Sequence, residues 1–249
     1  MITNPQSGTA IDEVAEGIYR ISTPVDVPAI PGGFSFNQYL IVDDEPMLFH
    51  TGLRHLFPLT KEAISKVMPV EKLRHIGFSH FEADECGALN EFLAVAPQAA
   101  PVSSEVGAMV SVNDVADRPG LGLADGAELN LGKHKLEFLY TPHVPHGWDC
   151  GILFDKTTET LLCGDLFTQP GKGGQAVTNE DIVELSEQFR GPMDYYAHCP
   201  GTTPVFDRLA ALNPKVLACM HGSAFQGNGS ELLLRLRDKL AASAITASA

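Results

Sequence analysis

Short apolar runs alternate with stretches of helical spacing along the chain, and this alternation is the sequence feature that most constrains the fold. Residues 36–42 and 46–49 are two apolar runs, and the polar turn between them predicts a β-hairpin. Residues 59–67 have helical spacing, and residues 75–79 then form a predicted buried strand. Strands grouped between helices indicate a layered α/β domain, with sheets inside and helices outside.

The alternation continues without a linker-like break, so we expect one domain that spans residues 1–249. Residues 241–249 are small and polar, and we expect them to form a frayed tail. The other predicted strands are residues 17–21, 128–131, 135–140, 151–154, 160–163 and 215–220, and the other predicted helices are residues 88–95, 104–112, 181–189, 205–212 and 231–242.

Charge and composition exclude several classes of function. Asp and Glu total 31 against 17 Lys and Arg, which gives a net charge of −14. Nucleic-acid phosphates and acidic membrane surfaces would repel such a chain, so we expect neither as a partner. No apolar run is long enough to span a bilayer, and the N-terminus lacks the pattern of a signal peptide. The five cysteines form no C-x-x-C pair, which predicts reduced thiols in a cytoplasmic protein.

Three side chains that can bind a metal follow the predicted strand at residues 75–79. His80, Glu82 and Asp84 occupy alternate positions, which project to one side of an extended segment. Imidazole and carboxylate groups at this spacing form a plausible metal-binding arrangement. Taken alone, the triplet is explained equally well by a solvated acidic loop.

Later segments also place a potential ligand where a predicted strand ends. The loop after residues 135–140 contains His143 and His146, Asp165 follows residues 160–163, and His221 follows residues 215–220. We expect His80, Glu82 and His146 to bind one cation, and Asp84, Asp165 and His221 to bind a second, with Asp165 able to bridge because a carboxylate offers two oxygens.

The order of these segments resembles that of the metallo-β-lactamase fold superfamily, from Phe36 through His221. The resemblance implies a four-layer αββα sandwich with two metal ions at one edge. Hydrolases of this superfamily usually carry His-x-His-x-Asp-His, whereas here Glu82 and Glu85 stand in place of two of the histidines.

The His-x-Glu-x-Asp form resembles the diiron domain of the flavodiiron proteins and related oxygen-binding diiron proteins. The segments Pro145-His146-Gly147-Trp148-Asp149 and Cys219-Met220-His221-Gly222 are similar to their other metal-binding motifs. Replacing imidazole by carboxylate favours iron over zinc, because oxygen-rich mixed sites suit the harder metal; zinc and manganese are the alternatives.

The resemblance implies a diiron oxidoreductase that binds or reduces O2 or NO with electrons from a separate partner. The alternative is a metal-dependent hydrolase that attacks an ester, lactone, thioester or phosphoester through a bridging hydroxide. A non-catalytic sensor of O2 or metal is a third hypothesis. Flavodiiron proteins carry a flavodoxin domain after the metal domain; we expect no such domain and no flavin site in this chain. The resemblance also implies a homodimer.

Three further polar residues are expected either to bind metal or to orient the ligands from behind. Glu85 stands where the family often has a ligand histidine, and His50 stands where the superfamily usually has aspartate. Asp149 is placed to orient His146. Phe81, Trp148 and Phe167 are expected either to wall the site or to belong to the core.

Overall fold

The computed structural model describes residues 1–247, and its strands form two sheets. The first sheet has eight strands in chain order: β1 (Ile2–Asn4), β2 (Thr9–Ala15), β3 (Ile18–Val25), β4 (Phe34–Ile41), β5 (Met47–Phe49), β6 (His75–Gly77), β7 (Ala100–Ser104) and β8 (Leu121–Leu123). Neighbours from β1 to β5 are antiparallel and those from β5 to β8 are parallel. The predicted hairpin is present, since β4 and β5 pair with Tyr39 opposite Phe49.

The second sheet has seven strands, and its topology brings several strand ends to one edge. Its order is β13 (Val177–Thr178), β15 (Ala224–Gln226), β14 (Val216–Cys219), β12 (Thr160–Gly164), β11 (Gly151–Asp155), β10 (Lys135–Tyr140) and β9 (Glu128–Asn130). β12 is parallel to β14, and both β10 and β12 are antiparallel to β11 between them. The carboxyl ends of β10, β12 and β14 therefore lie at the same edge.

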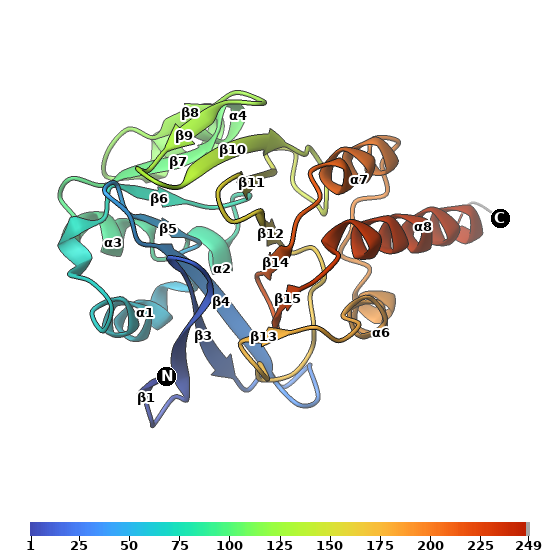
Figure 1. The fold of residues 1–249 in the computed structure, drawn as a ribbon, viewed down its shortest axis with the longest axis horizontal. Coiled ribbons are helices and arrows are strands. Elements are labelled where there is room, and N and C mark those ends of the chain that lie inside the picture. The colour runs from blue at the N-terminus through green and yellow to red at the C-terminus, as the bar shows by residue number, and fades with distance from the viewer. Residues whose placement is uncertain (248–249) are drawn as a thin grey trace.

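Helices cover the outer faces of both sheets (Figure 1). On the first sheet lie α1 (Phe57–Ile64) and α3 (Leu89–Val95), and on the second lie α6 (Val183–Met193), α7 (Thr202–Ala211) and α8 (Gly229–Ala247). Shorter helical turns are η1 (Arg54–Leu56), η2 (Val70–Lys72), α2 (Ala83–Cys86), α4 (Glu105–Gly107), the π-helical η3 (Ala108–Val112) and α5 (Asn113–Val115). The molecule is thus the expected αββα sandwich.

Buried apolar clusters fill each of the three spaces between these layers. Phe92 of α3 packs with Ile76 on the first sheet, and Phe206 of α7 packs in the cluster with Leu161 on the second. Leu162 belongs instead to the cluster between the sheets. Successive side chains of β12 face opposite layers, so this strand is buried on both sides. Double burial explains why its sequence is a continuous apolar run.

The C-terminal helix is longer than the sequence pattern predicts. Residues 241–247, where a frayed tail is expected, continue α8 to Ala247, and fraying of this end stays a prediction. Alanine has the highest helix propensity, so this small-residue segment extends a helix whose earlier turns are already packed on the sheet. Residues 248–249 lie outside the described part. Within residues 1–247, no helix has both the length and the apolarity to cross a membrane. All five cysteines are free thiols.

Candidate metal centre

The predicted ligands lie on loops at one edge of the sandwich. His80 follows β6 of the first sheet, and His146 lies in the loop from β10 to β11. Asp165 directly follows β12, and one residue, Met220, separates His221 from the end of β14. The parallel arrangement of β12 and β14 brings the last two residues to adjacent strand ends.

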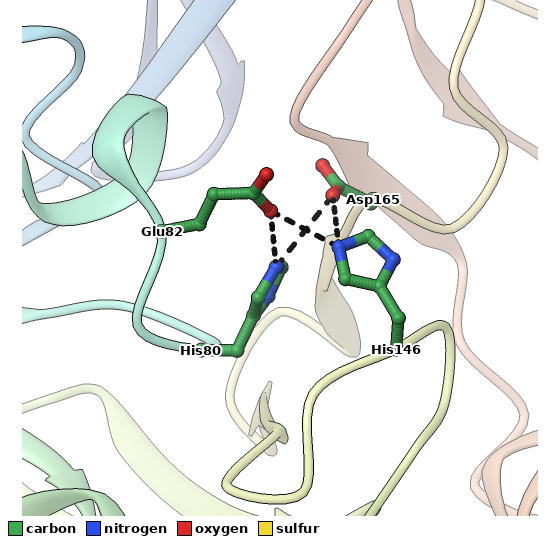
Figure 2. Close-up of side chains that lie close together, drawn as sticks. All are labelled: His80, Glu82, His146 and Asp165. Atoms are coloured by element: carbon green, nitrogen blue, oxygen red, sulfur yellow. Dashed lines mark hydrogen bonds and ion pairs between the residues drawn. The ribbon is translucent and has the colours of Figure 1, made fainter. Parts of the chain in front are cut away.

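Three of the predicted ligands, His80, Glu82 and His146, form a compact first group with Asp165. Ligand atoms of His80, Glu82, His146 and Asp165 lie within 4.8 Å of one another, and their side chains point toward a common centre (Figure 2). Glu82 Oε2 is 2.7 Å from His80 Nε2 and 3.0 Å from His146 Nε2. Asp165 Oδ2 completes the group, 3.5 Å from His146 Nε2 and 3.9 Å from His80 Nε2.

Asp84 and His221 form a second group on the other side of Asp165. His221 Nε2 lies 3.2 Å from Asp165 Oδ1 and 3.4 Å from Asp84 Oδ2. Asp165 therefore faces the first group with one oxygen and the second group with the other. The six residues predicted from the sequence are all brought together.

The orientation of the imidazoles fits a bound cation in each group. His221 Nδ1 is 2.8 Å from the backbone oxygen of Ser35, which can only accept, so Nδ1 carries the proton. His80 Nδ1 lies 3.1 Å from Ser79 Oγ, which itself donates to Glu85, and 3.2 Å from Glu85 Oε1; a proton on Nδ1 likewise leaves Nε2 with a lone pair. Lone pairs that face carboxylate oxygens repel them unless a proton or a metal ion lies between. Asp165 Oδ1 is buried and has no hydrogen-bond partner among the described residues.

The pKa values of His80 and His221 are raised, which also indicates that the centre favours positive charge. Burial lowers the pKa of His221, but the neighbouring carboxylates of Asp165 and Asp84 raise it to about 10. Burial also opposes a charge on His80, yet the Glu85 carboxylate and other partners hold its pKa far above the usual range. Hydrogen bonds from His146 and His80 lower the pKa of Glu82. The carboxylates around these imidazoles therefore favour positive charge at the centre.

Glu85 lies behind His80 rather than beside the second group. Its carboxylate accepts hydrogen bonds from the backbone nitrogens of Ser79 and His80, both at 2.8 Å, and from Ser79 Oγ at 2.5 Å. Of the two roles expected for Glu85, this geometry favours that of orienting a ligand from behind, because its oxygens are already occupied by these donors. His50 is fully buried, with Nε2 3.4 Å from Glu85 Oε1, and so contacts the orienting carboxylate rather than the ligands.

Asp149 does not orient His146, contrary to expectation. Its Oδ2 accepts a hydrogen bond from the backbone nitrogen of Phe81 at 2.9 Å, so it fixes the loop next to His80. His146 Nδ1 is buried without a hydrogen-bond partner in the described part of the chain. His143 is exposed and lies outside the first group.

The three aromatic residues expected at the wall or in the core take different positions. Phe81 lines a cavity beside Glu82, Phe167 belongs to the core, and Trp148 is 54% exposed. On the side of the second group, the ring centroid of Phe34 lies 4.2 Å from that of His221, and the ring centroid of Phe36 lies 5.4 Å from it. Both rings are on β4, far from His221 in the sequence. Their alternate spacing marks one face of a strand but carries no sign of what that face meets.

Tyr195 is a further residue near the centre that the sequence does not identify. Its ring lies 6.1 Å from the imidazole of His146, and its hydroxyl donates to the backbone oxygen of Asp165 at 3.3 Å. Burial raises its pKa, which keeps the hydroxyl protonated and able to donate. No motif surrounds this tyrosine in the sequence, so only the fold reveals its position.

Comparison with known proteins agrees with this geometry. The family model described as ODP family beta lactamase matches residues 34–222, a segment that includes both groups. The putative diflavin flavoprotein A 3 of Nostoc sp. is 26% identical over 218 residues, which cover 84% of this chain and 37% of that protein. The rubredoxin-oxygen oxidoreductase of Megalodesulfovibrio gigas is 26% identical over 206 residues, or 79% of this chain and 50% of that protein. The chain thus spans a third to a half of these relatives.

Solved structures share the fold. A variant of the flavo di-iron protein from Thermotoga maritima superposes with a TM-score of 0.82 at 18% identity, over 93% of this chain and 61% of that one. The family model covers well over half of the chain and includes every residue of the centre. The chain therefore belongs to the ODP family of beta lactamases, within the metallo-β-lactamase fold superfamily, and has the fold of a flavodiiron core.

Proposed function

We propose that this chain is a single oxidoreductase domain in which two iron ions bind O2 or NO and reduce it with electrons from a separate partner. The ligands assigned are His80, Glu82 and His146 for one ion, Asp84 and His221 for the other, and Asp165 for both. The names of the relatives, a rubredoxin-oxygen oxidoreductase and diflavin flavoproteins, support this class of reaction.

The observation that carries the proposal is the placement of Asp165. Its two oxygens face separate groups, with Oδ1 3.2 Å from His221 Nε2 and Oδ2 3.5 Å from His146 Nε2. A carboxylate in this position can hold two cations at once. The three imidazoles and three carboxylates form a mixed nitrogen and oxygen donor set, which suits iron; zinc and manganese are the alternatives that metal analysis would distinguish.

Two ferrous ions would supply electrons to a bound diatomic molecule. The protein's part is to orient the donors, since Glu85 and the Ser35 carbonyl fix the protons of His80 and His221 on Nδ1 and present Nε2 to the centre. Phe34 and Phe36 exclude water beside His221. Full reduction of O2 to water consumes more electrons than two ferrous ions hold, so an external donor must restore them.

Access to the centre is from the side of the first group. The Glu82 side chain is 50% exposed and that of His146 is 26% exposed, whereas that of His221 is 4% exposed. A diatomic substrate can therefore approach past Glu82 without displacing the core. Both O2 and NO belong to the proposal.

The hydrolytic alternative is not favoured. The relatives reported above are named as oxidoreductases or flavoproteins. Glu82 also replaces a histidine of the hydrolase motif by a carboxylate, which makes the first group more anionic.

We propose further that the protein works as a homodimer in the cytoplasm, where its five free thiols would stay reduced.

The test is anaerobic reconstitution with Fe²⁺ followed by mixing with O2. The wild-type chain should hold close to two irons and consume O2 once reduced, whereas Asp165→Asn should hold fewer and react slowly. Asp114→Asn, an exposed aspartate of α5 that belongs to neither group, is the matched control. A chain that retains zinc, stays inert to O2 when loaded with iron, and hydrolyses lactones or thioesters would contradict the proposal.

A further inference from the structure

The turn that carries His221 is held by the opposite sheet. We define the ligand turn as residues 219–222, which begin at the last residue of β14. Asn37 of β4 donates from Nδ2 to the backbone oxygens of Cys219 at 2.9 Å and Gly222 at 2.8 Å. Its backbone nitrogen donates to the Met220 oxygen at 2.9 Å, and the hydroxyl of Tyr39 donates to the Cys219 oxygen at 2.7 Å.

Arg20 of β3 adds a buried positive charge to these contacts. It is 2% exposed, and its Nη2 donates to the Gly222 oxygen at 2.7 Å and to Ser22 Oγ at 3.1 Å. Both of these partners are neutral. Burying a guanidinium against neutral partners is costly, so fixing the Gly222 carbonyl is a plausible reason for its presence.

Ser35 completes the hold on the ligand turn. Its Oγ accepts a hydrogen bond from the Gly222 nitrogen at 3.0 Å, and its backbone oxygen lies 2.8 Å from His221 Nδ1. Gly222 has φ of 91°, and a Cβ there would lie 2.5 Å from the side chain of Gln169. The turn therefore has one conformation available, and the first sheet specifies it.

The backbone beside His80 is held by a different set of residues. The Gly151 nitrogen donates to the Ser79 oxygen at 2.8 Å, and the Phe81 nitrogen donates to Asp149 Oδ2 at 2.9 Å. His80 follows a strand of the first sheet and is oriented by Glu85 of the next turn. The contacts of Arg20, Asn37 and Tyr39 fall instead on the backbone beside His221. Loss of these contacts should change the position of His221 Nε2 while leaving His80 in place.

We propose that Arg20, Asn37 and Tyr39 are positioning residues that set the affinity of the second group for its cation. The inference rests on the proposed dinuclear centre, but not on the reaction it performs. Because the donors act on backbone oxygens next to His221, their loss should weaken one of two binding steps. Removal of such an outer contact lowers metal affinity by about 10- to 100-fold in other proteins.

The experiment titrates metal-free protein with Zn²⁺ against a chromophoric chelator and resolves two binding steps. Asn37→Leu and Arg20→Met should weaken one step by about 10-fold or more and change the other by less than about threefold. Tyr39→Phe removes a single hydrogen bond and should have a smaller effect on the same step. Arg20→Lys keeps a donor and the charge and should recover part of the affinity lost in Arg20→Met.

The matched control is Thr23→Val. Thr23 lies on β3, the strand of Arg20, and the substitution removes its buried hydrogen bond to Thr9 of β2. This variant should retain both steps, even where its melting temperature falls. Equal weakening of both steps in the Asn37 and Arg20 variants, or unchanged binding in all of them, would overturn the inference. Wild-type protein that binds two ions but does not react with O2 would contradict the proposed reaction alone.

Discussion

At the scale of single residues, Glu85 determines which nitrogen of His80 is available to a metal. The carboxylate accepts from two backbone nitrogens and faces His80 Nδ1 at 3.2 Å. Because Ser79 Oγ donates to Glu85, it accepts from Nδ1 at 3.1 Å, and the Nε2 lone pair is then directed at the first group. An amide at this position offers a competing donor and favours the opposite tautomer, with Nε2 protonated.

Glu85→Gln should therefore weaken metal binding at the first group by about 10- to 100-fold, as expected for an orienting partner of a ligand histidine. Competition titration with a chromophoric chelator measures the effect. Glu91→Gln, which removes a carboxylate that pairs with Arg54 at the surface, should bind as wild type does. Affinities of Glu85→Gln and wild type that agree within about twofold would show that the carboxylate does not act through His80.

Metal binding should release protons at neutral pH. Neighbouring carboxylates raise the pKa of His221 to about 10 and also raise the pKa of His80, so we expect both imidazoles to carry a proton on each nitrogen at pH 7 when no metal is bound. A metal ligand must lose the proton on its binding nitrogen, so affinity should rise as pH rises toward the raised pKa values and fall on acidification. Calorimetry in buffers of different ionisation enthalpy counts the protons. Binding without proton release between pH 6 and 8 would contradict this account.

At the scale of secondary-structure elements, a buried ion pair joins two neighbouring strands of the second sheet, β10 and β11. The side chain of His134 is buried, and its Nδ1 lies 2.8 Å from Asp155 Oδ2. His134 precedes β10 and Asp155 ends β11, so the pair fixes the register of two antiparallel strands. The hydrogen bond raises the pKa of His134, and together with other donors it lowers the pKa of Asp155 despite burial.

His134→Gln should lower the free energy of unfolding by about 1.5–3 kcal/mol, the usual range for a hydrogen bond to a charged group. The raised pKa of His134 gives stability that is fully present below its unfolded value of about 6.5 and is lost as pH rises through the folded value. The lowered pKa of Asp155 gives stability present above about pH 4 and lost on further acidification. Urea unfolding should therefore show the largest difference between variant and wild type near pH 5. A difference that grows from pH 6 to 9 would contradict the pairing.

Much of the element order follows from the sequence, but side-chain direction does not. Continuous apolar runs such as Leu161-Leu162-Cys163 identify strands buried on both faces, and a ligand placed where such a run stops must lie at a sheet edge. Glu85 is different, since a carboxylate at that position could face either the metals or the backbone. The backbone nitrogens of Ser79 and His80 donate to the carboxylate and direct it toward the backbone, and only the fold reveals these two contacts.

At the scale of the whole molecule, the centre belongs to both sheets at once. The first sheet supplies the loop with His80, Glu82 and Asp84, and the second supplies His146, Asp165 and His221. The sandwich must therefore be closed before either group is complete, so metal binding and the packing of the two sheets should be coupled. The sequence indicates this set through four strand ends, whereas the aromatic wall of Phe34 and Phe36 depends on contacts between distant strands.

The central claim is that Asp165 lies between two iron ions, and anomalous diffraction at the iron edge tests it most directly. Crystals of protein reconstituted with Fe²⁺ should show two separate peaks. Both should lie within about 2.0–2.2 Å of an Asp165 oxygen, the distance usual for carboxylate bonds to a divalent metal such as zinc. One peak should lie beside His80 and His146 and the other beside His221. A single peak, or peaks remote from Asp165, would contradict the account.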